Sequence, residues 1–256
     1  KITPNRADCL GIKGIAREVV ALTQCEHNTF TIPTVPVSTG RMQAVRIDAP
    51  ADCGRFLARV IEGVDANATT PSWMVQRLQR SGIRSISALV DIGNYVMLEL
   101  GQPMHIFDAD KVTGSIIVRR AQDGEKLLCL NDKEVVLAAD TLVVADEAGV
   151  LSMAGLMGGA ASAVSDATVN VVLEAAWFQP NTIANKSRQY GFGSDSSYRY
   201  ERGVDSALQA DAIERAALLV HSICGGKVGA VTEALGELPV ANKVNVRTGR
   251  INKVLG

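Results

Sequence analysis

The chain has 256 residues, of which 47% are apolar and only 4% aromatic, and its formal net charge is −1. This length supports one large domain or two small ones, with a core built mainly from Val, Leu, Ile and Ala. The near-neutral charge argues against RNA binding through bulk electrostatics, which is typical of strongly basic domains, so any RNA contact is expected to be local. No apolar run reaches the roughly 18 residues of a membrane span, and we expect no membrane contact.

The cysteines are odd in number and widely scattered, and none forms a CxxC pair: Cys9, Cys25, Cys53, Cys129 and Cys224. This pattern disfavours both a disulfide framework and a zinc site, and predicts a reducing, cytoplasmic setting with no bound metal. The chain opens in mid-pattern without an initiator Met or a signal peptide, which suggests a piece of a larger protein.

A first helix is predicted over residues 8–24, with Asp8 as its N-cap. Its apolar residues recur on one helical stripe, at Ile12, Ile15, Val19 and Leu22. Residues 26–42 contain two Pro and end near a Gly, a composition typical of a linker or an edge strand.

The next part of the chain mixes strands and helices. Residues 45–49 and 56–64 have strand-like patterns, and Ser72 is predicted to cap a helix that stops at Gly82. A second helix is expected from Ile86 to Leu100 and ends at Gly101.

Short apolar or alternating runs with turn residues between them then predict strands at residues 115–121, 126–130, 133–138, 141–146 and 169–178. Pro180 is expected to open a helix that ends at Gly191, and a long helix should run from Asp205 as its cap to about Ile223. Strands and helices without strict alternation indicate the α+β class.

Four motifs occur in a fixed order: GQPMHIFD at 101–108, LSMAGLMGG at 151–159, VVLEAAWFQP at 171–180 and SRQYGFGSDSSYRYERGVD at 187–205. In this order they resemble the B3/B4 region of bacterial phenylalanyl-tRNA synthetase beta subunits. The likeness covers essentially the whole chain, from ITPNRADCLGIKGIAREVVAL to RINKVLG.

The resemblance implies a β-sandwich of unusual topology with flanking helices, preceded by a short N-terminal helical segment. It also implies three parts: the end of a preceding domain at 1–41, an editing domain at 42–240, and the start of a B5-like domain at 241–256.

His105 follows Gln102 and Pro103, and Pro fixes the chain direction, so we expect a loop in which the imidazole is held in place. The residues alone favour a structural role, as they do for His27 and His221. The resemblance implies instead that His105 lines an editing pocket.

Glu174 is an acidic residue within an otherwise apolar strand, where a carboxylate is costly unless it is paired or hydrogen-bonded. The residues alone leave open an Arg partner or a ligand. The resemblance implies that Glu174 accepts a hydrogen bond from the phenolic hydroxyl of bound tyrosine. A pocket built for phenylalanine cannot strongly reject an isostere with one added hydroxyl, so a second site has to select for that hydroxyl.

The Gly-rich stretch 154–159 fits neither GxGxxG nor a P-loop, and the residues favour a tight turn where a ligand could approach bare backbone. The resemblance places the substrate end at Ala154, Gly158 and Gly159. It adds Ser194 and Ser196, where the family commonly has Thr and Ala, so this chain departs at both positions. Neither Ser has a triad at motif spacing, so we expect hydrolysis by an oriented water, with His105 and Ser194 as candidate catalytic residues and the ribose hydroxyl assisting.

The segment 187–205 interleaves three Arg with three Tyr, at Arg188, Tyr190, Tyr198, Arg199, Tyr200 and Arg202. Such side chains suit RNA backbone and stacked bases, but they also suit an internal Arg–Glu network around Glu201. We favour internal bracing for Arg202, and the role of Arg199 stays open.

The leading hypothesis is hydrolysis of the ester of mischarged tyrosyl-tRNA(Phe), within an ATP-dependent ligase. The partners implied are tRNA(Phe), tyrosine as the editing ligand and an alpha subunit in an alpha2beta2 assembly. ATP and Mg²⁺ would bind elsewhere in the ligase, with no cofactor in this chain. The alternatives are a tRNA-binding or scaffolding module without chemistry, and a free-standing trans-editing hydrolase.

Overall fold

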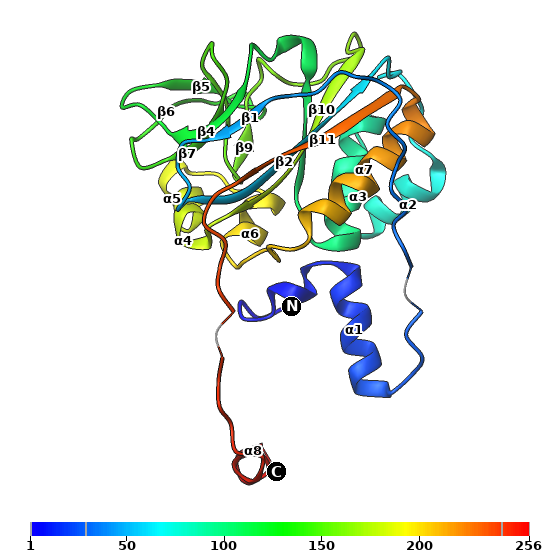
Figure 1. Cartoon of the computed structure of the whole chain (residues 1–256), viewed down its shortest axis with the longest axis vertical. Coiled ribbons are helices and arrows are strands. Elements are labelled where there is room, and N and C mark those ends of the chain that lie inside the picture. The colour runs from blue at the N-terminus through cyan, green and yellow to red at the C-terminus, as the bar shows by residue number, and fades with distance from the viewer. Residues whose placement is uncertain (1, 29, 242, 256) are drawn as a thin grey trace.

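The computed structural model describes residues 2–28, 30–241 and 243–255, and its main body has three layers (Figure 1). A layer of helices covers one face of a four-stranded sheet, and the other face of that sheet packs against a five-stranded sheet. The predicted α+β sandwich with flanking helices is therefore confirmed.

The four-stranded sheet is antiparallel and has the order β11-β2-β10-β3. Its central strands are β2 (Cys53–Glu62) and β10 (Asn170–Phe178), which pair over nearly their whole lengths. The flanking strands are β3 (Met104–Asp108) and β11 (Lys227–Leu235). Strands β3 and β11 were not expected from the sequence.

The five-stranded sheet has the order β1-β4-β7-β8-β9, with β1 and β4 parallel and the other pairs antiparallel. Its strands are β1 (Val45–Ile47), β4 (Ile116–Arg120), β7 (Leu142–Ala145), β8 (Val150–Met153) and β9 (Met157–Gly158). A separate hairpin is formed by β5 (Lys126–Leu128) and β6 (Glu134–Val136).

Alternation along β10 explains why it sits between two hydrophobic clusters. Val171, Leu173 and Ala175 face the helices α2 (Ser72–Arg80), α3 (Ala88–Leu100) and α7 (Gln209–Cys224). Val172, Ala176 and Phe178 face the second sheet. Because side chains alternate with a period of two, Glu174 points to the same side as this second set, between the two sheets.

The N-terminal segment consists of a 3-10 helix η1 (Ala7–Leu10) and α1 (Ile12–Thr23), which lie below the main body (Figure 1). Asp8 was expected to cap this helix, and that expectation is wrong. Gly11 is the N-cap, and the Asp8 carboxylate accepts hydrogen bonds from Arg6 instead. The apolar stripe of α1 is exposed, up to 81% at Leu22.

The extended segment after α1 is strapped to the main body at Val35. The Val35 amide donates to Glu214 (2.7 Å) and its carbonyl accepts from Arg59 (2.7 Å). Arg59 and Glu214 also form an ion pair of 2.8 Å with the Arg side chain 2% exposed. Further on, the Ser38 amide donates to the Val228 carbonyl, so this stretch runs along the edge of β11.

Several helix ends differ from the sequence expectations. Pro71, not Ser72, precedes α2, and α7 begins at Gln209, while the Asp205 carboxylate accepts from the Ala207 amide. A single helix was expected after Pro180, but the structure has two short helices, α4 (Pro180–Ile183) and α5 (Lys186–Tyr190). Asn185 separates them because its φ of 66° is incompatible with a continuous right-handed helix. Helices end at Gly101 and Gly191 as predicted, and both glycines adopt the left-handed conformation.

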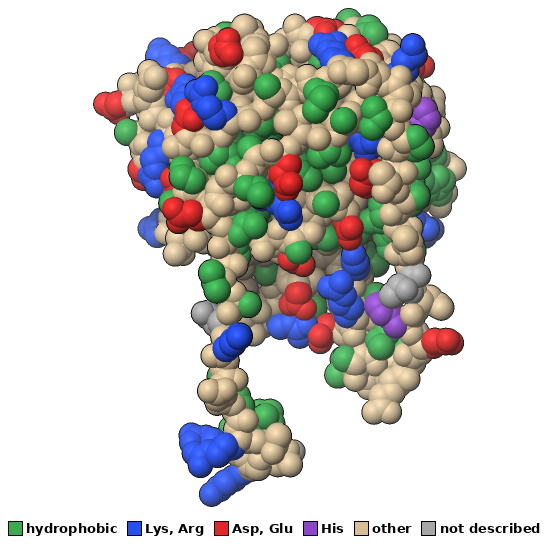
Figure 2. Space-filling model, in the orientation of Figure 1, with side chains coloured by type: hydrophobic (Ala, Val, Ile, Leu, Met, Phe, Trp, Pro, Cys, Tyr) green, Lys and Arg blue, Asp and Glu red, His purple; other side chains and the backbone are tan. Residues whose placement is uncertain are grey.

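Two further helices complete the chain. The polar segment 187–205 contains α6 (Asp195–Tyr200), a helix that the sequence did not predict. Helix α8 (Thr248–Leu255) follows an extended tail and has no buried residue. Figure 2 shows acidic and basic side chains interspersed over the viewed face of the main body. Among the described residues no helix is long and apolar enough to cross a membrane, and no cluster of metal-ligating side chains occurs.

Candidate functional site

A cavity of about 510 Å³ lies where β3 and β10 meet the turn between β8 and β9, the start of α6, and one face of α3. Of the residues expected at the site, five line this cavity: His105, Gly158, Glu174, Ser194 and Ser196. Ala154 and Gly159 do not. Ala154 is buried in the cluster between the sheets, and the Gly159 amide donates to the Leu151 carbonyl of β8.

His105 and Glu174 are direct neighbours across two antiparallel strands. They are register partners in the β3–β10 ladder, so their side chains leave the same face of the sheet. The expectation that His105 lies in a loop is wrong, because the chain enters β3 at Met104, immediately after Pro103. A sheet edge therefore holds the imidazole, instead of a flexible connection.

Within residues 2–28, 30–241 and 243–255, the carboxyl group of Glu174 has no hydrogen-bond partner at its buried Oε2 atom, and the residue is only 6% exposed. Burial raises the pKa of this carboxyl group to about 8. At neutral pH the group is therefore mainly protonated, which lowers the cost of keeping it in an apolar layer.

The imidazole of His105, like the carboxyl group of Glu174, is buried and has a pKa shifted by burial. Its Nε2 atom is buried without a partner, and burial lowers the pKa of the ring to about 4. The ring meets Phe107 edge to face with centroids 4.4 Å apart. A neutral imidazole is a weak base here, but it can still accept or donate one hydrogen bond to a ligand or a water.

Gly158 is required by the position of His105. A Cβ atom at Gly158 would lie 2.6 Å from His105 Cε1 and 2.8 Å from Leu130 Cδ1, closer than van der Waals contact permits. The glycine therefore leaves room for the imidazole and for a ligand beside it.

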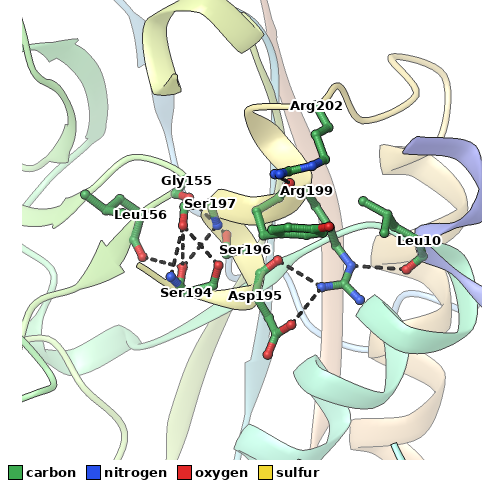
Figure 3. Close-up of polar contacts among 10 residues, drawn as sticks. Leu10, Gly155, Leu156, Ser194, Asp195, Ser196, Ser197, Arg199 and Arg202 are labelled. Carbon is green, nitrogen blue, oxygen red and sulfur yellow. Dashed lines mark hydrogen bonds and ion pairs between the residues drawn. The ribbon is translucent and has the colours of Figure 1, made fainter. Parts of the chain in front are cut away.

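The two serines belong to the opposite wall, at the start of α6 (Figure 3). Ser194 caps this helix, since its Oγ accepts from the Ser197 amide (3.0 Å) and donates to the Leu156 carbonyl (2.7 Å). Ser196 Oγ donates to the Gly155 carbonyl at 3.2 Å. Both hydroxyl protons are thus engaged by backbone, and neither serine has a neighbouring base that would make it a nucleophile.

Sequence reasoning missed Tyr200, whose ring lines the cavity. Its hydroxyl donates to the Ala176 carbonyl (3.0 Å) and accepts from Gln102 Nε2 (3.1 Å), and Gln209 donates to the Gln102 side chain at 2.8 Å. This buried network supplies the hydrogen bonds to the Ala176 carbonyl of β10, just beyond the point where β3 begins at Met104. The GQP motif offered a signal for this network. The side-chain amide of Gln102 lies next to Pro103, which interrupts the strand, and a buried amide needs hydrogen-bond partners.

Arg84 and Asn94 also line the cavity and were not singled out. Arg84 follows α2, whose last turn contains Arg77 and Arg80. Its position at the cavity depends on the turn between α2 and α3, which periodicity does not specify.

The polar segment around α6 makes internal contacts. The Arg202 guanidinium lies 3.5 Å from the ring centroid of Tyr198, donates to the Tyr198 carbonyl at 2.8 Å and pairs with Glu201. These contacts agree with the bracing role favoured for Arg202. Arg199, whose role the sequence left open, is buried and donates to Asp195 and to the Leu10 carbonyl (Figure 3).

Comparison with known proteins identifies the family. The family model described as the B3/4 domain matches residues 52–225. The phenylalanine–tRNA ligase beta subunit of Neisseria gonorrhoeae is 71% identical over 256 residues, which is 100% of this chain and 32% of that protein. The corresponding subunit of Chromobacterium violaceum is 57% identical over 256 residues, with 100% and 33% covered.

An N-terminal fragment of the phenylalanyl-tRNA synthetase beta subunit from Pyrococcus horikoshii aligns with a TM-score of 0.49 at 17% identity, over 98% of this chain and 70% of that one. The chain spans 32% of the length of the first of the curated relatives that it matches. The family predicted from the motifs is confirmed by the match of the family model and by the Neisseria relatives. The chain belongs to the B3/4 domain family, in the form found in beta subunits of phenylalanine–tRNA ligase.

Proposed function

We propose that this chain edits tRNA(Phe) by hydrolysing the ester that joins a wrongly attached tyrosine to it. One observation carries the proposal. His105 and Glu174 project side by side into one cavity, each with a buried polar atom that has no hydrogen-bond partner among the residues that the structure describes. Unsatisfied buried polar groups are rare in folded proteins, and a polar ligand group would satisfy these two.

The hydroxyl of tyrosine fits this pair chemically. A phenol can donate to the Glu174 carboxyl and accept from a neutral His105, whereas the ring of phenylalanine would leave both atoms unpaired. Leaving a buried polar atom unpaired costs about 1–3 kcal/mol, so the two atoms can separate tyrosine from phenylalanine.

The hydrolytic step would use water as the nucleophile. The water oxygen attacks the ester carbonyl carbon, the bond to the ribose oxygen breaks, and that oxygen takes up the proton that the water loses. Ser194 and Ser196 would hold the wall of the cavity, since their hydroxyl protons are engaged by Leu156 and Gly155. The ribose hydroxyl next to the ester is the group proposed to assist the proton transfer, because the described part of the cavity offers no strong base.

In the same proposal the chain works within an ATP-dependent phenylalanine–tRNA ligase. Its partners would be tRNA(Phe) and an alpha subunit in an alpha2beta2 assembly, with ATP and Mg²⁺ bound outside this chain. The relatives named as phenylalanine–tRNA ligase beta subunits support this context.

Deacylation assays test the proposal. Purified protein is incubated with tyrosyl-tRNA(Phe) and, separately, with phenylalanyl-tRNA(Phe), and release of the amino acid is followed over time. We expect rapid release of tyrosine alone. Binding of tRNA without faster release would favour the alternative of a binding or scaffolding module. The same assay on the full ligase and on this chain separates an editing domain from a free-standing hydrolase.

A further inference from the structure

We infer that Arg199 is a positioning residue that ties the N-terminal segment to the wall of the cavity. This inference rests on the proposed function, because it concerns the same cavity. According to this inference, the position of η1 and α1 on the main body affects the affinity of the cavity for its ligand.

The contact is built from a buried side chain. The Arg199 side chain is 8% exposed and reaches from α6 to η1, where Nε donates to the Leu10 carbonyl at 3.2 Å. Its Nη1 atom donates to the Asp195 carbonyl at 2.9 Å and to the Asp195 carboxylate at 3.2 Å. One guanidinium therefore joins two segments that are almost two hundred residues apart in the chain (Figure 3).

On the cavity side, Asp195 lies between the two serines of the wall. Asp195, Ser194 and Ser196 all line the cavity, and the serines are bonded to the carbonyls of Leu156 and Gly155. A displacement of Arg199 would therefore move the first turn of α6 and, through these bonds, the turn that leads to β9.

On the other side, Leu10 cannot move alone. A Cβ atom at Gly14 would lie 1.7 Å from the Asp8 carbonyl oxygen, so η1 is folded tightly against α1. Arg6 holds the same unit together through Asp8 and Glu18. The position of α1 therefore sets the position of the carbonyl that Arg199 binds.

Two substitutions break the contact from opposite ends. Arg199→Met removes the guanidinium and keeps much of its volume. Gly11→Ala leaves Arg199 intact but introduces a Cβ atom 2.5 Å from the Gly101 amide nitrogen, on the fixed backbone that ends α3. The N-terminal segment has to shift, and Leu10 with it.

The experiment uses the full-length ligase and measures steady-state deacylation of tyrosyl-tRNA(Phe) and the binding of a non-hydrolysable tyrosyl-adenosine analogue. We expect each variant to raise KM and the Kd of the analogue by roughly 3- to 30-fold with little change in kcat. A variant that is only partly unfolded would lower kcat and leave KM unchanged. Arg55→Met is the matched control, because Arg55 also joins a carboxylate and a distant carbonyl, at Glu233 and Ser206, away from the cavity.

The double variant gives the decisive result. If both changes act through one contact, the double variant should resemble each single variant, and their effects on Kd should not multiply. Multiplied effects, or a Gly11→Ala protein with unchanged KM and Kd, would overturn the inference. If Arg199→Met does not fold, Gly11→Ala decides by the same KM and Kd values. A wild-type protein that neither deacylates the substrate nor binds the analogue would refute the proposed function instead.

Discussion

The two walls of the cavity differ in how their polar groups are bonded. On the strand wall, His105 and Glu174 each have a buried polar atom that no described residue hydrogen-bonds. On the helix wall, the hydroxyls of Ser194 and Ser196 are bonded to backbone carbonyls. A ligand can gain new hydrogen bonds from the first wall, whereas the second wall mainly gives the cavity its shape.

This difference assigns selectivity and shape to separate parts of the molecule. Residues 105 and 174 come from two strands that are fixed by their ladder, so their spacing does not depend on a loop. Substitutions on the two walls should therefore have different consequences, which the following measurements can establish.

The largest effect is expected from Gly158→Ala. Its Cβ atom would displace the His105 ring and shift the bound tyrosine, and a misplacement of about 1 Å in a bound substrate can cost around 100-fold in rate. We expect deacylation of tyrosyl-tRNA(Phe) to fall by about that factor with the melting temperature little changed. Gly40→Ala is the control, because a Cβ atom there meets nothing within 4 Å. Equal rates for the two variants would contradict the placement of His105 at the site.

Glu174→Ala is expected to act on selectivity. Without this carboxyl group, bound phenylalanine no longer leaves a buried acceptor unpaired, which costs about 1–3 kcal/mol, so the preference for tyrosine over phenylalanine should fall about 5- to 150-fold. Competitive binding of the two amino acid analogues measures this preference. Glu174→Gln keeps a donor and an acceptor and should lose less. A folded Glu174→Ala protein with unchanged preference would exclude this residue as the reader of the hydroxyl.

The strand wall should also be visible in the pH dependence of stability. The pKa of Glu174 is raised to about 8, so between its ordinary range and pH 8 the folded protein binds more protons there than the unfolded chain. Stability should fall as the pH rises through this window. The lowered pKa of His105 has the opposite effect on stability, which rises with pH in the range below the ordinary His value of 6.5. In that range the unfolded chain binds more protons at this residue than the folded protein does.

Between pH 6.5 and 8 the Glu174 effect is therefore expected without opposition from His105, at about 2 kcal/mol. Glu174→Gln should remove most of this loss. Denaturant midpoints of the two proteins at several pH values in the window measure it, and parallel curves would show that Glu174 is ionised in the folded protein.

The smallest effect is expected on the helix wall. Ser194→Ala removes an N-cap and should lower the free energy of unfolding by about 1 kcal/mol, with the tyrosine preference unchanged within about threefold. Ser194→Thr keeps the cap and serves as the control. Ser196→Ala should cost less, since its single bond to Gly155 is longer. A large loss of tyrosine preference in Ser194→Ala would give this wall a direct role in selection.

Local signals predicted part of this arrangement well. The left-handed ends at Gly101 and Gly191 follow from glycine itself, and Glu174 was marked by its charge within an apolar strand. The presence of Glu174, Gly158 and His105 in one cavity came from family resemblance and not from their spacing, because the register of β3 on β10 is a long-range property.

Other features could not be read locally. Tyr200 and Gln102 line or support the cavity through contacts between segments about a hundred residues apart. Whether Ala154 or Gly155 faces the cavity depends on the turn at Gly155, whose φ is 66°. The short helix α6 was hidden because Ser, Asp and Tyr are poor helix formers, and its capping box and contacts to the neighbouring turn compensate.

The strap at Val35 has a practical consequence for anyone who wishes to isolate the main body of the chain. A truncated protein that starts at residue 42, where the family resemblance implied a boundary, would lose the backbone groups that bond to Arg59 and Glu214. It would also expose the edge of β11 next to Val228, which Ser38 now covers. Open strand edges promote aggregation. Expression fragments should therefore begin upstream of Val35, and poor solubility of shorter ones would reflect this missing cover instead of an unstable sandwich.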